Sequence, residues 1–344
     1  MKKRYDVIAL GELLVDFTEN GVSGQGNPLL EANPGGAPCN VLAMLQKLDK
    51  NTAFIGKVGK DMFGKQLREA AEGAGICMDF LLEDEYVHTT LAFVKTFPNG
   101  DRDFSFYRDP GADMMLRADE LPVDALKNTR IFHFGTLSMT HHEPMLATRK
   151  ALNLARDAGA LISFDPNLRP PLWHSLEQAR EQIDWGLRNC DILKIADNEL
   201  EFMTGETDFD KGAAKLRAKY PNIRLLNVTA GAEGSYSFYE DLRVFVPAFK
   251  LGGTIETTGA GDTFCASVLN FVLETVWTGS RSGSCGRCSA LPMPQPIWSP
   301  PKKAPSGPCR RRRRCWRSWP STEQRSLNCN FHGPGHSTNM AGQL

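Results

Sequence analysis

The sequence of 344 residues contains no run of about 18 consecutive apolar residues, so no transmembrane helix is predicted. The first residues, MKKRYDVIALGELLVDF, are basic and then apolar. Asp6, Glu12 and Asp16 interrupt the apolar stretch, and no small-residue cleavage site follows. This pattern is typical of a buried strand rather than of a signal peptide. We therefore expect a cytoplasmic protein with no membrane partner.

Other absences exclude further classes of protein. The sequence lacks the G-x-x-x-x-G-K-[ST] pattern, so a P-loop nucleotide site is not expected. The four cysteines before residue 277 have no paired spacing, which favours reduced thiols over a disulfide framework. His133, His141 and His142 lack the i, i+4 spacing of a helical metal site, and structural roles are expected for them.

Acidic residues are nearly absent from one part of the chain. Residues 277–344, here called the tail, hold 11 Lys and Arg residues but a single acid, Glu323. The tail also holds nine of the 21 prolines and five of the nine cysteines. Residues 1–276 carry a net charge of −10, against +10 for the tail. This abrupt change near Trp277 indicates two parts that need separate interpretations.

Residues 1–276 alternate between short apolar runs and helix-like stretches. Short apolar runs separated by amphipathic helices are typical of βαβ units, which predicts an α/β fold with a parallel sheet covered on both faces. The runs lie at 5–11, 52–58, 130–139, 160–166, 191–196 and 223–230, and the helices at 37–48, 61–74, 143–158, 175–189 and 208–219.

The segment 89–108 differs, because two alternating strands flank Asn99-Gly100, a strong hairpin signal. We expect this hairpin to form a small β element beside the main sheet. Ligands of open α/β sheets bind beyond the carboxyl ends of the strands, so the hairpin could cover that crevice.

Two glycine-rich segments open helices. In the first, Gly35 and Gly36 would let the backbone approach a ligand closely, with Asn40 in the first turn; a plain turn is the alternative. In the second, small residues leave N–H groups free to face an anion at the helix start, beside Asp262. That carboxylate could accept a proton from an attacking hydroxyl, and a simple helix cap is the alternative.

Eight motifs resemble, in the same order, motifs of the ribokinase-like (PfkB) carbohydrate kinases. The residues of PGGAP and FYRDPGADM are most similar to those of the fructokinase branch. The resemblance runs from about residue 5 to 275. The motifs are GELLVDF, PGGAPCNVLAMLQKL, AFIGKVGKDMFGKQL, FYRDPGADMML, SFDPNLRPPLW, KIADNELEFMTG, NVTAGAEGS and ETTGAGDTF.

The resemblance implies a three-layer α/β/α sandwich with a small β-sheet lid, built from the early strands and the hairpin 89–108. It implies a cytoplasmic kinase that uses ATP and Mg²⁺ to phosphorylate a sugar hydroxyl, with D-fructose converted to D-fructose 6-phosphate as the preferred reading. A kinase of 2-keto-3-deoxygluconate or another sugar, or a catalytically impaired sugar-binding remnant, is the alternative. A homodimer formed through the lid is a further expectation.

The resemblance also implies roles for single residues. Asp262 matches the catalytic base. Arg108 would reach the sugar from the lid, and Arg169 would contact phosphate or form a surface salt bridge. The remaining matches are Gly259, Ala260 and Gly261 for the anion hole, Asp16, Gly35, Gly36 and Asn40 for the sugar, Thr229, Gly231 and Gly234 for the nucleotide, and Glu199 for a magnesium-bound water.

Two positions depart from the family pattern. Ala196 stands where the family has the Asn of an N-x-x-E element, which removes one expected contact to magnesium-bound water. Glu256 stands where the family has an Asp before TTGAGD. In relatives that position helps to bind a monovalent cation, so such a cation is only a candidate cofactor here.

The tail allows three interpretations. Cys285, Cys288, Cys309 and Cys315 suggest zinc, but their spacings fit no standard zinc pairing beyond one C-x-x-C. The arginines 310–314 suggest nucleic acid, but an arginine run alone carries no sequence specificity, and we expect no nucleic-acid partner. The third interpretation, a frameshift, explains more.

PfkB kinases should continue with an Ala-rich FANAAA-like helix and a TKKGA-like loop, which the reading frame of the tail lacks. Back-translation of Leu291 to Trp319 in a shifted frame allows the reading FANAAANLVTTKKGAIRAMPEEEEVLEEL. Each shifted codon takes its last two bases from fixed positions of the codons of the tail, and only its first base depends on the choice between synonymous codons. Met293 and Trp298 have a single codon each, so the first base of the shifted codon that begins in either of them is also fixed. We hypothesise that the tail is a frameshift product, starting between about 275 and 290, and expect it to be largely disordered. A chain continuing in the second frame is called the frame-restored chain.

Overall fold

The structure, a computed structural model, describes residues 3–96, 102–248 and 259–275. All of them belong to the first of the two units of the chain, Met1–Ser299. The tail, the Asn99-Gly100 turn and Glu256 lie outside the described residues. Among the helices in the described ranges, none has both the length and the apolar character that a bilayer-spanning helix requires.

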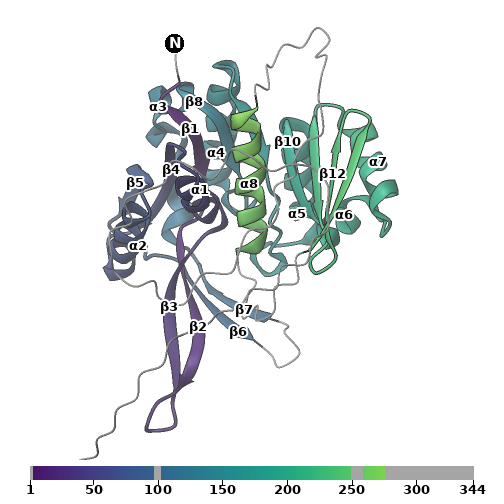
Figure 1. Cartoon of the computed structure of the whole chain (residues 1–344). Helices are drawn as coiled ribbons and strands as arrows, with labels where there is room; N and C mark the ends of the chain where they lie inside the picture. The colour runs from purple at the N-terminus through teal and green to yellow at the C-terminus, as the bar shows by residue number, and fades with distance from the viewer. Residues whose placement is uncertain (1–2, 97–101, 249–258, 276–344) are drawn as a thin grey trace, which may run out of the picture. The chain divides into compact units, whose positions relative to one another are not determined.

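The main sheet has nine strands in the order β13-β12-β11-β10-β9-β8-β1-β4-β5 (Figure 1). The pairs from β11 to β5 are parallel, whereas β12 and β13 are antiparallel. The predicted α/β fold is therefore confirmed, with a mixed rather than wholly parallel sheet. The strands are β1 Tyr5–Leu10, β4 Thr52–Gly59, β5 Cys77–Asp84, β8 Thr129–Phe134, β9 Leu161–Phe164, β10 Ile192–Ala196, β11 Leu225–Thr229, β12 Gly234–Tyr239 and β13 Leu242–Pro247.

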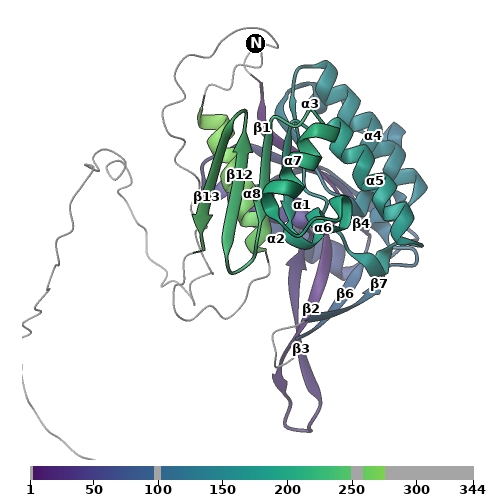
Figure 2. The same ribbon diagram turned by 90° about the vertical axis from the view of Figure 1, so that its right-hand side faces the viewer.

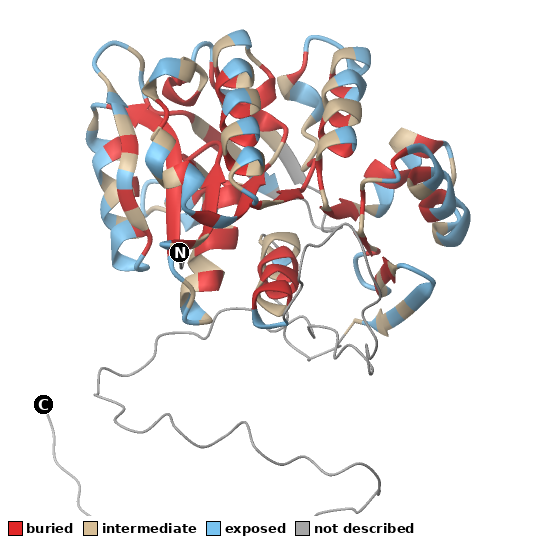
Figure 3. Cartoon of the chain, turned by 90° about the horizontal axis from the view of Figure 1, so that it is seen from above, coloured by how far each residue is buried: buried red, intermediate tan, exposed pale blue. Residues whose placement is uncertain are grey.

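Helices cover both faces of this sheet and create two apolar cores (Figures 2 and 3). One core contains buried residues of α1 Ala37–Lys47, α2 Met62–Gly73 and α8 Ala260–Glu274. The other contains buried residues of α3 Val123–Lys127, α4 His142–Asp157, α5 Leu176–Asn189, α6 Asp197–Thr204 and α7 Phe209–Lys219. The three-layer α/β/α arrangement is the predicted one.

Strand β1 shows why the first apolar run folds as it does. Val7 and Ala9 lie in one core, whereas Ile8 and Leu10 lie in the other. Successive side chains of a strand point to opposite faces, and both faces are covered here. A continuous apolar run therefore forms this central strand without exposing any apolar side chain.

A second, four-stranded sheet of order β3-β2-β6-β7 forms the lid. Its strands are β2 Leu14–Val22, β3 Pro28–Gly35, β6 Leu91–Thr96 and β7 Arg102–Tyr107. β6 and β7 pair antiparallel, as the predicted hairpin requires, and β2 pairs parallel with β6. Figure 1 shows β2 and β3 projecting away from the main sheet. Phe17 of β2 stacks on Phe93 of β6 with ring centroids 5.0 Å apart.

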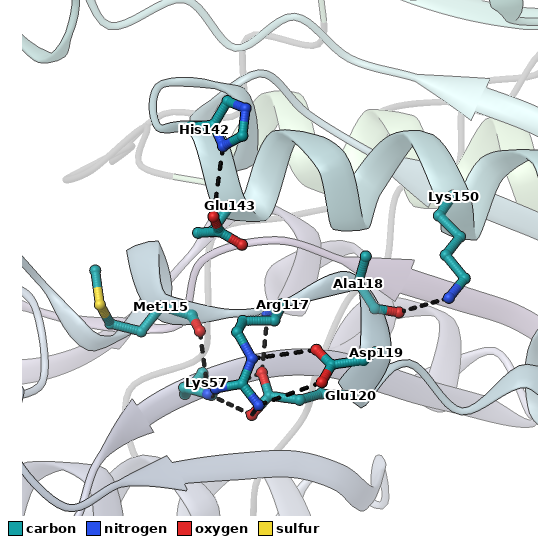
Figure 4. A network of polar contacts seen from close by, with 9 residues as sticks. All are labelled: Lys57, Met115, Arg117, Ala118, Asp119, Glu120, His142, Glu143 and Lys150. Carbon is teal, nitrogen blue, oxygen red and sulfur yellow. Dashed lines mark hydrogen bonds and ion pairs between the residues drawn. The ribbon is translucent and has the colours of Figure 1, made fainter.

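A buried lysine anchors the segment that joins the lid to the core (Figure 4). This segment contains the short 3₁₀ helices η1 Ala112–Met115 and η2 Ala118–Glu120. The Nζ of Lys57, on β4, donates to the carbonyl of Met115 at 3.1 Å and to both carboxylate oxygens of Glu120 at 2.7 and 2.9 Å. All three ammonium donors are therefore used inside the protein, which fixes the segment against β4.

One expected strand is wrong in its length. The apolar run 130–139 was predicted as a single strand, but β8 ends at Phe134 and the chain continues into the 3₁₀ helix η3 Leu137–Met139. Leu137 and Met139 are nevertheless buried. Their apolar character therefore reflects burial in an irregular segment, which a run of apolar residues alone does not distinguish from a strand.

Candidate active site

The two glycine-rich helix starts meet in the structure. The side-chain amide of Asn40, on α1, donates to Oδ2 of Asp262, on α8, at 2.9 Å, although the residues are 222 positions apart. Figure 1 shows α1 beside α8. Two of the sequence-predicted site residues are thus in direct contact.

Helix α1 begins at a position that requires glycine. Gly36 has φ +123°, and a Cβ there would lie 2.5 Å from the carbonyl oxygen of Glu12. Gly36 has no side chain to cap the helix, and Glu12 supplies the cap instead: its Oε1 accepts a hydrogen bond from the N–H of Ala37 at 3.0 Å. The start of α1 is therefore capped by a tertiary contact rather than by a neighbouring side chain.

Burial raises the pKa of Glu12 from 4.5 to about 7, despite the hydrogen bond from Ala37. A raised carboxyl pKa means that the folded protein binds the proton more tightly than the unfolded chain. The associated stability is complete below about pH 4.5 and is lost as the pH rises through about 7.

Glu12→Gln should therefore be more stable than the wild type at pH 8, by about 1–3 kcal/mol, because the amide keeps an acceptor for Ala37 but cannot ionise. The difference should shrink as the pH falls and vanish near pH 4, below the unfolded-state pKa of 4.5. Urea unfolding of both proteins at the two pH values measures it. An equal loss of stability at both values would contradict this explanation.

Helix α8 presents an uncapped N-terminus. Its N-cap is Gly259, which has φ +76° and makes no side-chain cap bond. Asp262 lies in the first turn rather than at the N-cap, so the alternative of a simple cap is not what the structure shows. The N–H groups of this first turn are suited to an anion, because the N-cap residue Gly259 has no side chain that could accept from them.

Asp262 is an acceptor of suitable basicity for proton transfer. Burial raises its pKa to about 6, while the hydrogen bond from Asn40 and the charges of Lys194 and Arg169 act in the opposite direction. The carboxylate is therefore ionised at neutral pH, yet it holds a proton more strongly than an exposed aspartate would.

A buried ion pair lies directly under the start of α8. Nζ of Lys194, on β10, is 3.1 Å from each carboxylate oxygen of Asp165, and both side chains are buried. A Cβ on Gly261 would be 3.2 Å from this Nζ. Burial alone would lower the pKa of Lys194, but the charges of Asp165, Glu199 and Asp262 raise it. One cation is thus shared by three carboxylates.

A cavity opens between these elements, beyond the carboxyl ends of β8 and β9, where ligands of open α/β sheets bind. His133 on its wall is hydrogen-bonded through Nδ1 to Ser163 Oγ at 3.0 Å. Burial lowers the pKa of His133 to about 3, so the imidazole is neutral, and its structural role stays a prediction. The lining residues are Glu12, Ala37, Pro38, His133, Gly135, Thr136, Leu137, Asp165, Asn167 and Asp262.

Asp16 lies on lid strand β2, next to the first glycine pair. A Cβ on Gly35 would be only 2.2 Å from Asp16 Oδ2, so the carboxylate packs directly on that glycine. β2 and β3 pair with Leu14 opposite Gly35 and Asp16 opposite Asn33. The lid therefore carries Asp16 to the segment that leads into α1, and its contact with sugar stays a prediction.

Arg169 follows β9 in the DPNLR segment and contacts the lid. Its guanidinium carbon lies 5.8 Å from the ring centroid of Phe104, on β7, and its Nη1 donates to the carbonyl of Leu168 at 3.2 Å. Within the described ranges it forms no salt bridge, which was the alternative to a phosphate contact. Its charge lowers the pKa of Asp262.

Glu199 is buried and already holds two backbone donors. Its Oε1 accepts from the N–H of Leu168 at 2.7 Å, and its Oε2 from the N–H of Ala196 at 2.8 Å. These bonds tie the DPNLR segment to the start of α6. Each carboxylate oxygen can accept a further hydrogen bond, so its expected contact with magnesium-bound water stays a prediction.

The predicted nucleotide residues lie at the turn between β11 and β12. Thr229 pairs with Ala196 of β10 at the carboxyl end of the sheet. Gly231 has φ +49° with open space around its Cα, whereas a Cβ on Gly234 would lie 2.1 Å from the carbonyl oxygen of Val246. The turn thus needs glycine at both positions, and one of them exposes backbone.

Comparisons with known proteins identify the family. The pattern of the pfkB family carbohydrate kinases matches residues 5–290. Fructokinase-2 of Solanum habrochaites is 39% identical over 270 residues, which cover 78% of this chain and 82% of that protein. Fructokinase-1 of Zea mays is 40% identical over 270 residues, covering 78% and 83%.

Solved structures agree with this result. The fructokinase of Xylella fastidiosa has a TM-score of 0.70 and 30% sequence identity, with 78% of this chain and 82% of that chain covered. The chain belongs to the PfkB family of carbohydrate kinases. It is a fructokinase-like transferase that acts on an alcohol group, and the resemblance noted in the motifs is confirmed.

Sequence reasoning missed three charged residues of this site. Lys194 could have been noticed as a single lysine inside the apolar run DILKIA, and Asp165 as the acid that ends the run ALISF. Glu12 was noticed only as a charge that interrupts an apolar stretch. All three are charged residues inside or directly after a buried apolar run, where a charge needs a partner, and that is the signal they share.

Proposed function

We propose that the protein transfers the γ-phosphoryl group of ATP to a hydroxyl of D-fructose and releases D-fructose 6-phosphate. The observation that carries the proposal is the Asn40–Asp262 hydrogen bond at the uncapped start of α8, which puts a base beside anion-binding N–H groups. Relatives that share about 40% of their residues with this chain are named fructokinases.

The chemistry follows from positions and charges. Asp262 accepts the proton of the attacking hydroxyl while the oxygen of that hydroxyl bonds to the γ-phosphorus of ATP. The bond between this phosphorus and the β–γ bridging oxygen breaks, and ADP leaves with that oxygen. The first-turn N–H groups of α8 stabilise the negative charge that develops on the phosphoryl oxygens. Asn40 orients the carboxylate, and Asp16 accepts hydrogen bonds from other sugar hydroxyls.

The residues present fit ATP and magnesium. Phosphate groups would be bound by the N–H groups at the start of α8, by the guanidinium of Arg169 and by the exposed backbone of the Thr229–Gly234 turn. Glu199 would accept a hydrogen bond from magnesium-bound water. ATP would supply the phosphoryl group, and Mg²⁺ would neutralise its charge. The fructokinase of Xylella fastidiosa, 30% identical to this chain, has been solved with bound ATP. A monovalent cation remains a candidate only.

Sugar-dependent release of ADP tests the proposal. The frame-restored chain should release ADP from ATP and Mg²⁺ with D-fructose and much less with 2-keto-3-deoxygluconate, and the chain as it stands should release little ADP with either sugar. A strong preference for 2-keto-3-deoxygluconate would leave the family unchanged but reject fructose. Fructose binding without any ADP release would favour the sugar-binding remnant, an alternative that arises because the tail lacks the segments that the resemblance assigns to the nucleotide site.

Two further expectations belong to this proposal. Apolar side chains are exposed along the lid, which supports self-association through it: Val22, Leu29, Leu30 and Tyr107 are each more than 40% exposed. A cytoplasmic location also stays a prediction. The same holds for the division of the chain into a kinase domain at 1–276 and a tail at 277–344.

A further inference from the structure

Arg108 and Asp113 form a buried ion pair where the lid joins the core. Arg108 follows β7, and Asp113 lies in η1. Nε of Arg108 donates to Asp113 Oδ2 at 2.8 Å, and Nη2 is 2.7 Å from the same oxygen. The two side chains are only 3% and 2% exposed, so this pair is shielded from solvent ions.

Most of the remaining hydrogen-bonding groups of the pair are also occupied. Nη1 of Arg108 donates to Thr140 Oγ1 at 2.8 Å, and Nη2 to the carbonyl of Leu137 at 3.0 Å. Oδ1 of Asp113 accepts from Thr90 Oγ1 at 2.5 Å. Of the five N–H donors of the guanidinium, one on Nη1 has no protein acceptor in the described part of the chain.

The pair lies next to the wall of the cavity that contains Leu137. Leu137, whose carbonyl binds Arg108, lines the cavity together with Glu12. The charges of Asp113 and Arg108 both act on the pKa of Glu12, the first raising it and the second lowering it. The pair is thus close enough to influence what binds there.

The charges around the cavity oppose an acidic ligand. Its lining holds the carboxyl groups of Glu12, Asp165 and Asp262, and Lys194 is already shared among carboxylates. Arg108, whose Nη2 donates to the carbonyl of Leu137, is a cation beside this wall that could compensate a substrate carboxylate. Asp113 cancels its charge and holds its guanidinium at a fixed place.

We propose that Asp113 is a specificity-determining residue: by neutralising Arg108, it makes the cavity accept uncharged sugars and reject sugar acids. This inference rests on the proposed function, since it concerns the same sugar site. It also gives Arg108 a role other than the direct sugar contact expected from the sequence, because the guanidinium is used within the protein.

Calorimetric titration of the full chain with D-fructose and with 2-keto-3-deoxygluconate, without nucleotide, tests the proposal. Asp113→Asn keeps acceptors for Thr90 and Arg108 but removes the charge. Its dissociation constant for 2-keto-3-deoxygluconate should fall at least tenfold, about 1.4 kcal/mol, while that for fructose changes less than threefold. Glu120→Gln is the matched control, because it removes the carboxylate beside the buried Lys57 and should leave both constants unchanged.

Each outcome has a defined meaning. A folded Asp113→Asn variant without gain for the acid, or a wild type that binds both sugars equally, overturns the inference but leaves the proposed function. Binding of neither sugar by the wild type overturns both. If Asp113→Asn does not fold, Asp113→Ser repeats the test, and failure of both variants to fold assigns Asp113 a structural role and overturns the inference.

Discussion

In the frame-restored chain, Asp262→Asn is expected to lower turnover by a factor on the order of 10²–10⁴, because the variant loses the group that accepts the proton of the attacking hydroxyl. The new amide is close in size and keeps an oxygen that can accept from Asn40, so fructose should still bind. Steady-state kinetics and calorimetric titration with fructose measure the two effects separately.

A pH profile and a matched variant distinguish this role from a structural one. In the wild type kcat/KM should fall as the pH drops through about 6, the raised pKa of Asp262, and the variant should lack this acid limb. Asp61→Asn is the control, because Asp61 is a true N-cap that accepts from the N–H groups of Phe63 and Gly64. It should change stability little, because an asparagine caps a helix about as well as an aspartate, and it should leave turnover nearly unchanged. Wild-type-like turnover of Asp262→Asn would reject its assignment as the base.

The fold was largely predictable because its central strands are buried on both faces. Such strands appear as short apolar runs, and the intervening amphipathic helices have a different period. β12 and β13 were missed because they lie at the edge of the sheet and alternate with polar residues. Ser235 and Ser237 occupy one face of β12, and Ser237 donates to Asn227 rather than packing in an apolar core.

The site was predictable only where its chemistry is local. Gly36, Asn40 and Asp262 stand at helix starts whose composition allows either a ligand or a plain turn and helix cap, and the resemblance favoured the ligand. The pairing of Lys194 with Asp165 could not be read from the sequence, because it depends on parallel strands whose partners are 29 positions apart. The partner of Arg108 is five positions away but lies in an irregular 3₁₀ segment, for which no periodicity predicts contacts.

The reading frame raises a separate question about the full chain. The family pattern matches residues 5–290, and the out-of-frame reading that resembles the family begins at Leu291. That reading continues without interruption over the 29 codons from Leu291 to Trp319. Such a long family-like reading is notable because only the first base of each shifted codon can be chosen among synonymous codons. Resequencing the DNA around codons 275–290 tests the frameshift directly.

Restoring the frame is expected to restore ATP binding. The shifted reading supplies the FANAAA-like and TKKGA-like segments that the resemblance assigns to the nucleotide site, and it replaces the arginines 310–314 by one proline and four glutamates. The frame-restored chain should therefore bind Mg²⁺ and ATP at least tenfold more tightly than the chain as it stands, about 1.4 kcal/mol, in a calorimetric titration. It should also be more soluble. A chain ending at residue 290 is the control: it should bind ATP as weakly as the full chain, because it lacks the same segments. Equal ATP affinity of the full and frame-restored chains would refute the frameshift hypothesis, since the tail would then complete the nucleotide site as it is.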